Sequence, residues 1–259
     1  MPVCSYFDNL EPDNPDAEIW RFIRFEFFED LMANEELHFT RADLFQDEHE
    51  GIPPDNYIRH VMGLRRYDPK DEMTLNHQLG SLAQHREAFY ILCWQFFREE
   101  TVEMWEKFAK FGVAIRSTYA KLKACLDGML DTTHLGVMRY GEQRLYQTGR
   151  VNVLQFINTK REQYGAEQEV RAIVWRADPF DGGNRHFDLN NVPHPRPLPE
   201  NKRHHWVQDF KRRRIDLKGL LTGVVVSPFA DEDTLAKAQQ WSKVGQPEYE
   251  VRPSILAIG

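Results

Sequence analysis

The sequence predicts an α+β fold: a single domain with a central mixed, mostly antiparallel β-sheet flanked by helices. Two observations lead to this prediction. Short apolar, β-prone runs alternate with helical stretches along the chain, which argues against an all-helical bundle. A strand, a helix and a strand between residues 221 and 252 have the order of a βαβ crossover, which makes part of the sheet parallel. The expected domain spans residues 19–256, after an N-terminal extension over 1–18.

The first 54 residues predict a strand, a helix and a second strand. Residues 19–23 form a short β-prone run, residues 25–32 carry apolar side chains at helical spacing, and a strand is expected over 37–40. Acidic, turn-rich residues 43–54 end this opening. Two polar helical stretches follow, near 55–65 and 70–87.

The middle of the chain predicts the centre of the sheet. Residues 88–94 are almost wholly apolar, which is typical of a strand covered on both faces. Ser117 or Thr118 is placed to cap the helix that follows. The next expected elements are a helix over 99–108, a strand over 112–117 and a helix over 119–129.

The second half predicts four more strands, two helices and a surface insertion. Gly182-Gly183 and the four prolines at alternate positions over 193–199 prevent regular hydrogen bonding, and they favour an extended insertion around 178–205. The strands are expected over 135–140, 168–175, 221–226 and 249–252, and the helices over 151–164 and 231–243.

Composition excludes several classes of protein. With 41% hydrophobic residues among 259, the chain can bury a core, so disorder of the whole chain is excluded. The net charge of −7 argues against a nonspecific coat on nucleic acid or anionic lipid. No membrane span or signal peptide is visible, so the cytoplasm is the expected location. Three scattered cysteines argue against disulfides or a cysteine-based zinc site, and no metal site is predicted.

The segment around residue 169 is the most suggestive for chemistry. On a strand, Glu167, Glu169 and Arg171 lie on one face. Crowded carboxylates raise each other's pKa and a nearby guanidinium lowers it, so such a triplet can hold two acids in different protonation states. The alternative is a solvated or cross-strand ion-pair network, worth about 0–1 kcal/mol per exposed pair. Both interpretations stay open.

Arg21 is the second candidate, between Trp20 and Phe22 on the first strand. A guanidinium held on a core strand offers a rigid fork for phosphate or carboxylate. Alternatively, its stem packs against its neighbours while its head reaches water.

The acidic residues 47–51 form a dense cluster in a turn. Their spacing matches no calcium loop. We therefore expect a solvated turn rather than a cation site.

A basic strip interrupts the acidic sequence between residues 202 and 214. Together with His204, His205 and Trp206, this strip predicts a surface that binds phosphates or a single strand of nucleic acid. The alternative is a basic loop that compensates acidic neighbours. The six basic residues are Lys202, Arg203, Lys211, Arg212, Arg213 and Arg214.

Several motifs occur in a fixed order: Trp20-Arg21-Phe22, 28–31, 37–45, Glu50-Gly51, Cys93-Trp94, Met104-Trp105, 112–118, 137–140, Lys160-Arg161, 167–173 and 224–228. Together they resemble the bacterial domain-of-unknown-function 2971 family over roughly residues 19–256. Gln95 departs from the pattern, where relatives often carry His or Ser, and so does His49, where an apolar residue is usual. The resemblance implies fold and motif positions more than activity.

A second resemblance implies a mechanism. Arg21 on an early strand, Cys93-Trp94-Gln95 in the middle and a late Glu-x-Glu resemble the Arg–Ser–Glu arrangement of mono-ADP-ribosyltransferases, although the middle motif lacks its usual hydroxyl. The resemblance implies NAD as substrate and an oxocarbenium-like transition state. It assigns Arg21 to the diphosphate, Trp94 to the nicotinamide wall, Glu169 to catalysis and Glu167 to the acceptor, and counts Arg171 among the cofactor-binding residues.

Two functions are therefore expected from the sequence. The first is an NAD-dependent ADP-ribosyltransferase or NAD glycohydrolase that acts as a toxin or phage-defence effector. The alternative is a non-catalytic sensor or interaction module that binds a nucleotide or nucleic acid through Arg21 and the basic strip. Neither requires a membrane partner.

Overall fold

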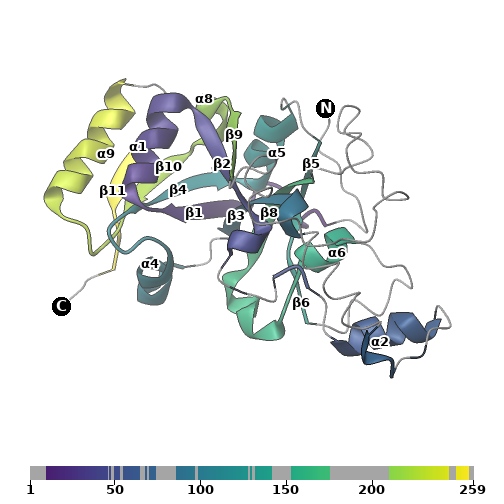
Figure 1. Cartoon of the computed structure of the whole chain (residues 1–259). Helices are drawn as coiled ribbons and strands as arrows, with labels where there is room; N and C mark the ends of the chain where they lie inside the picture. The colour runs from purple at the N-terminus through teal and green to yellow at the C-terminus, as the bar shows by residue number, and fades with distance from the viewer. Residues whose placement is uncertain are drawn as a thin grey trace, which may run out of the picture. The chain divides into compact units, whose positions relative to one another are not determined.

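The computed structural model describes residues 10–45, 47, 50–52, 55–64, 68, 70–73, 86–96, 99–127, 129, 132–141, 153–175, 210–244 and 249–256. They form the predicted α+β fold, with a mixed, mostly antiparallel sheet (Figure 1). The strands are β1 (Glu18–Ile23), β2 (Glu36–Arg41), β3 (Phe89–Phe96), β4 (Val113–Thr118), β5 (Thr133–Val137), β6 (Arg139–Tyr140), β7 (Thr159–Lys160), β8 (Glu169–Trp175), β9 (Phe210–Arg214), β10 (Gly223–Val226) and β11 (Glu250–Pro253).

The helices lie between these strands along the chain. The α-helices are α1 (Phe25–Asn34), α2 (Asp55–Leu64), α4 (Val102–Phe108), α5 (Tyr119–Asp127), α6 (Val153–Ile157), α8 (Leu217–Leu220) and α9 (Glu232–Val244). The short 3₁₀ helices are η1 (Ala42–Leu44), η2 (Arg86–Ala88) and η4 (Glu162–Glu167). None of the helices described is long and apolar enough to cross a bilayer.

The chain divides into two compact units, each built from separate segments. The first unit comprises Met1–His38, Cys93–Leu135 and Arg212–Gly259, and the second comprises Phe39–Leu92 and Gly136–Lys211. The boundaries fall inside β2, β3, β5 and β9 rather than in linkers. The predicted insertion at 178–205 lies outside the described residues, as do residues 1–9 of the predicted extension.

In the first unit the strands follow the order β11-β10-β4-β1-β3. β10 and β11 are parallel, with Val224 opposite Val251, because α9 carries the chain between them and packs on both. The crossover predicted from the sequence is thus confirmed. The β10–β4, β4–β1 and β1–β3 pairs are antiparallel. Helix α5 packs on β4 and helix α4 on β1.

The core of the first unit is aromatic and aliphatic. Trp20 and Trp105 are almost completely buried with Ala114 and Val225, and Phe22 packs edge-on against Trp105 at 4.9 Å between ring centroids. Burying an aromatic ring stabilises the fold by roughly 1.5–3 kcal/mol. The prediction that Trp105 is a core residue is confirmed.

In the second unit, β2 and β8 both pair with β3. β2 and β3 are antiparallel, with Thr40 opposite Ile91. All seven residues of β8 are buried. Both faces of β8 are therefore covered, and the face that carries Glu169 and Arg171 is not solvated.

Some predicted boundaries differ from the structure. The helix expected over 151–164 ends at Ile157, because Thr159 pairs with Arg139 in the small parallel sheet β6–β7. Tertiary pairing here overrides local propensity. The helix expected from residue 99 begins at Val102, where the Thr101 hydroxyl accepts a hydrogen bond from the Met104 backbone N–H at 3.2 Å. Of the expected helix 70–87, residues 74–85 lie outside the described part of the chain.

Candidate functional site

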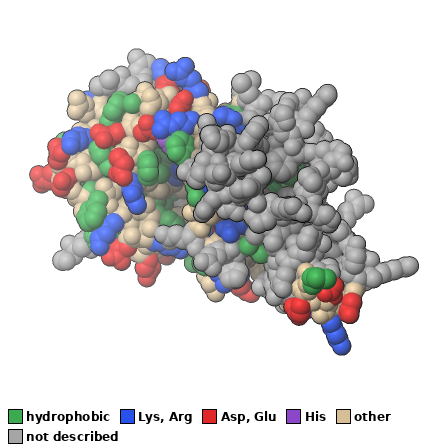
Figure 2. Space-filling view, viewed as in Figure 1, with side chains coloured by type: hydrophobic (Ala, Val, Ile, Leu, Met, Phe, Trp, Pro, Cys, Tyr) green, Lys and Arg blue, Asp and Glu red, His purple; other side chains and the backbone are tan. Residues whose placement is uncertain are grey.

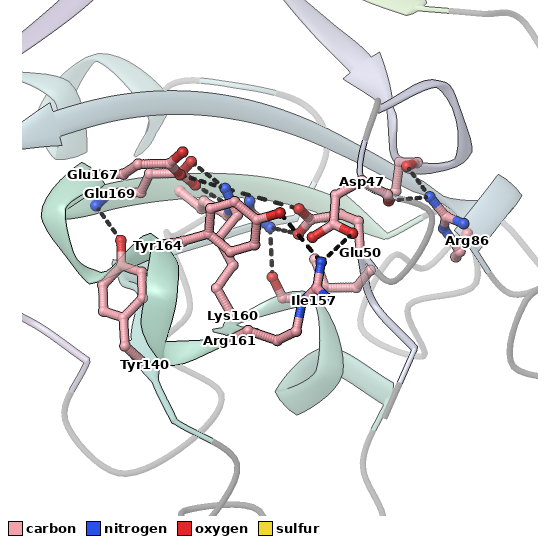
Figure 3. A network of polar contacts seen from close by, with 12 residues as sticks. Asp47, Glu50, Arg86, Tyr140, Ile157, Lys160, Arg161, Tyr164, Glu167 and Glu169 are labelled. Carbon is pink, nitrogen blue, oxygen red and sulfur yellow. Dashed lines mark hydrogen bonds and ion pairs between the residues drawn. The ribbon is translucent and has the colours of Figure 1, made fainter. Parts of the chain in front are cut away.

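A cluster of buried charges occupies the second unit and contains the predicted Glu-x-Glu motif (Figure 3). We call it the carboxylate cluster. Its members are Glu50, Lys160, Glu167, Glu169 and Arg171.

Arg171 lies at the centre of the cluster and is 0% exposed. Its Nε donates to Glu169 Oε2 at 2.7 Å, and its Nη1 donates to the Ile157 carbonyl at 2.8 Å and to Glu50. A guanidinium without water is stable only when carboxylates and carbonyls replace its hydration. Arg171 therefore dictates where the two acids must lie.

Lys160 links the two carboxylates of the Glu-x-Glu motif. Its Nζ lies 2.6 Å from Glu169 Oε1 and 2.7 Å from Glu167 Oε2. Burial and the nearby Arg171 lower the pKa of Lys160, but the surrounding carboxylates outweigh them and raise it above its usual range. The ammonium stays charged at any physiological pH.

Glu169 is 5% exposed and remains ionised. Burial alone raises the pKa of its carboxyl, but Arg171 and Lys160 outweigh burial and lower that pKa to about 2. Its backbone N–H donates to the Tyr140 hydroxyl at 2.8 Å. Burial raises the pKa of Tyr140 to about 12, so its phenol keeps its proton.

The local backbone explains how the motif is oriented. Glu167 ends η4, Gln168 has a left-handed conformation with φ of 45°, and Glu169 begins β8. The spacing of the two glutamates predicts that both lie on one regular strand. This prediction is wrong, because only Glu169 belongs to a strand. Lys160, which contacts both carboxylates, holds them together instead.

The described residues of the acidic turn, Asp47, Glu50 and Gly51, are buried or largely buried, so the prediction of a solvated turn is wrong for them. Glu50 is 3% exposed because it neutralises Arg171. Asp47 accepts from Arg161 Nη2 at 3.1 Å. Gly51 has φ of 72°, and a Cβ built there would come within 2.3 Å of Ile157 Cδ1. Only glycine fits this turn without strain.

The charge patterns of the sequence do not predict that Lys160 and Glu50 belong to the carboxylate cluster or that Tyr140 contacts Glu169. One feature of the sequence does indicate that Arg171 has buried acidic partners. Arg171 lies in a run of apolar residues, Val170 to Trp175. A cation on a strand of that character needs buried acids from elsewhere in the chain.

Arg21 and Trp94 belong to the first unit, whereas Glu167, Glu169 and Arg171 belong to the second. Arg21 Nη2 donates to the His38 carbonyl at 3.4 Å, while its Nη1 is inaccessible to water and has no hydrogen-bond partner among the described residues. No carboxylate within the described residues pairs with Arg21. Burial lowers the pKa of Arg21 to about 10, so the guanidinium stays charged at neutral pH.

Trp94 follows the same pattern as Arg21. Its side chain is 0% exposed, and the indole Nε1–H finds no acceptor in the part of the chain that the structure describes. In the antiparallel β1–β3 pair Trp20 lies opposite Gln95, so the next positions along the two strands are Arg21 and Trp94. Two buried donors that have no acceptor among the described residues thus occur at neighbouring positions of β1 and β3.

The basic strip is described only in part. Lys202 and Arg203 lie outside the described residues, while Lys211 to Arg214 belong to β9. Arg212 lies 3.5 Å from Asp30 Oδ1 and 3.8 Å from Glu36 Oε2. Its charge is therefore partly compensated by acids of the first unit.

The carboxylate cluster offers one chemical capacity. The carboxylates of Glu167 and Glu169 both contact the ammonium of Lys160, and Glu169 stays ionised although it is buried. Electrostatic interactions are stronger in such a dehydrated site than in water. Among the described residues, no group of His, Cys, Asp and Glu side chains has the geometry of a metal site. Comparison with known proteins adds no assignment: no family model, no curated protein and no solved structure matches the chain.

Proposed function

We propose that the protein acts on NAD, as an ADP-ribosyltransferase or NAD glycohydrolase, with Glu169 as the catalytic carboxylate. The observation that supports the proposal is the position of Glu169, whose ionised carboxylate is fixed by Lys160 and Arg171 beside the second carboxylate of Glu167. The choice of NAD follows from the resemblance of the motifs to mono-ADP-ribosyltransferases.

The proposed reaction breaks the bond between nicotinamide and the ribose anomeric carbon. Nicotinamide leaves with the bonding electron pair, and the ribosyl cation is captured by water or by an acceptor nucleophile, which loses a proton. A carboxylate near this cation lowers the barrier by electrostatic stabilisation. The low pKa of Glu169 suits this role and not that of a proton acceptor, which leaves Glu167 to orient the acceptor.

The first test measures nicotinamide release from NAD by the purified protein, together with transfer of label from labelled NAD to proteins or nucleic acids of a lysate. The proposal expects at least one of the two activities. If the wild-type protein shows neither, the proposal is wrong, whatever the variants do.

The second test compares Glu169→Gln with Glu162→Gln, an exposed acid at the start of η4. We expect the first variant to lose about 100-fold or more in rate and the second to match wild type. Thermal melting shows whether each variant is folded. A folded Glu169→Gln protein with wild-type activity would exclude Glu169 from catalysis.

A second candidate function is nucleotide binding without catalysis, favoured by the unpartnered donors of Arg21 and Trp94. Both groups donate and cannot accept, so an acceptor such as a phosphate oxygen would satisfy them. Calorimetric titration with ADP of wild type and Arg21→Met tests it. Binding that is lost in the variant supports the candidate, while no binding to wild type, or equal binding to both, excludes it.

A further inference from the structure

A pocket of about 440 Å³ lies in the first unit, beside α5 and the segment from β9 to α8. Its volume is within the range of about 300–1,000 Å³ typical of sites for small molecules. The lining residues are Lys121, Ala124, Cys125, Arg214, Ile215, Asp216 and Gly219. None of them belongs to the carboxylate cluster.

Two cations, Lys121 and Arg214, line this pocket. Within the described part of the chain, the side chains of Lys121 and Arg214 form no ion pair, hydrogen bond or ring contact. Lys121 differs in this respect from Lys123 of the same helix α5, which pairs with Glu11. Acidic and basic side chains are interspersed over the described part of the face shown in Figure 2.

Asp216 supplies an acceptor on the same pocket. Its carboxylate makes no side-chain cap at the start of α8. Gly219 allows its close approach, because a Cβ at that position would lie 2.8 Å from Asp216 Oδ2. Asp216 therefore lies close to Gly219 in α8, and its oxygens are not used in a cap hydrogen bond of that helix.

Cys125 forms part of the wall and carries no competing charge. Burial, with a contribution from the Asp216 charge, raises the pKa of its thiol to about 11. With the thiol neutral, Lys121, Arg214 and Asp216 leave the lining with one net positive charge. In a chain with a net charge of −7, this local excess favours an anion.

We propose that this pocket binds a small organic anion. A phosphate or carboxylate group lies between Lys121 and Arg214, and a hydroxyl or amino group of the same molecule donates to Asp216. Ala124 and Ile215 contact its carbon atoms. The proposal does not depend on NAD chemistry, because it involves other residues than the carboxylate cluster.

The experiment uses Cys125 as a reporter of pocket occupancy. The full chain is alkylated with iodoacetamide, and modification of Cys125 is followed by peptide mass spectrometry. The probes are glycerol 3-phosphate and glycerate, which share two hydroxyls and differ in the anionic group, with glycerol as the neutral control at equal ionic strength. We use about 10 mM of each, because ligands of this size bind with millimolar Kd.

We expect at least one of the anions to slow Cys125 alkylation by about threefold or more, and glycerol to have no effect. Protection by glycerol 3-phosphate alone identifies a phosphate site, and protection by glycerate alone a carboxylate site. The double variant Lys121→Met/Arg214→Met should lose the protection, while Lys218→Met, on α8 but outside the pocket lining, should keep it. Absence of protection by either anion, or protection that persists in the double variant, overturns the proposal.

Discussion

Charged residues are used differently in the carboxylate cluster and in the pocket of the first unit. In the cluster, the buried cations Arg171 and Lys160 both contact the nearby Glu169, and Arg171 also contacts Glu50 from a distant part of the sequence. In the pocket, the exposed cations Lys121 and Arg214 have no acid partner within the described residues. The difference follows from solvation, because water replaces a partner at the surface and only protein groups can do so in the interior.

The largest expected effect comes from removing the central cation. Arg171→Met leaves Glu50 and Glu169 buried without their guanidinium, and we expect the free energy of unfolding to fall by about 3–5 kcal/mol. Urea denaturation measures the change. The control is Arg212→Met, whose side chain is 43% exposed and lies near Asp30, and for which we expect a loss below about 1 kcal/mol. Equal losses in the two variants would show that burial does not distinguish these pairs.

The second prediction concerns acid. The pKa of Glu169 is about 2 in the folded protein, against 4.5 for an ordinary glutamate, so between these values the unfolded chain binds more protons. The stabilisation that the ionised Glu169 contributes is therefore fully present above pH 4.5, and it is lost as the pH falls towards 2. We expect Glu169 to account for roughly 2–3 kcal/mol of this loss.

Urea denaturation at a series of pH values separates Glu169 from the other acids. Glu169→Gln should be less stable than wild type near neutral pH, and the gap should narrow as the pH falls below 4.5. A gap that stays constant with pH would contradict the low pKa assigned to Glu169.

The third prediction concerns the turn that places Glu50. Gly51→Ala puts a Cβ on a backbone with φ of 72° and close to Ile157, so we expect a loss of about 1–2 kcal/mol. Gly165→Ala is the matched control, since its Cβ would make an ordinary contact of 4.0 Å with Tyr140. Its stability should stay within about 0.5 kcal/mol of wild type. If the two substitutions cost the same, the left-handed turn is not what holds Glu50.

The smallest expected effect is in the pocket. Because Lys121 and Arg214 have no acid partner within the described residues, Lys121→Met and Arg214→Met should each change the free energy of unfolding by less than about 0.5 kcal/mol. A loss above about 1 kcal/mol in either variant would mean that the cation contributes to folding, and the contrast with the carboxylate cluster would weaken.

Most of the first unit's architecture was predictable from local patterns. The apolar runs around Trp20 and Val225 and the final strand–helix–strand segment all appear as predicted, because strand pairing there follows side-chain hydrophobicity. The end of the helix expected over 151–164 was not predictable in this way. Thr159 and Lys160 leave the helix and pair as β7 with β6, and local propensity carries no information about this tertiary contact.

The α+β class and the order of most elements could be predicted from the amino-acid sequence alone, which also singled out the segment around Glu169 as a candidate site. The folded structure adds the burial of Glu50, the contacts of Lys160 with both Glu167 and Glu169, and the pocket that Lys121 and Arg214 share. These two groups of features differ in the sequence separation of the residues that interact. Hydrophobic periodicity acts between near neighbours in sequence, whereas buried charges are neutralised by partners that folding brings from far along the chain, as Glu50 does for Arg171.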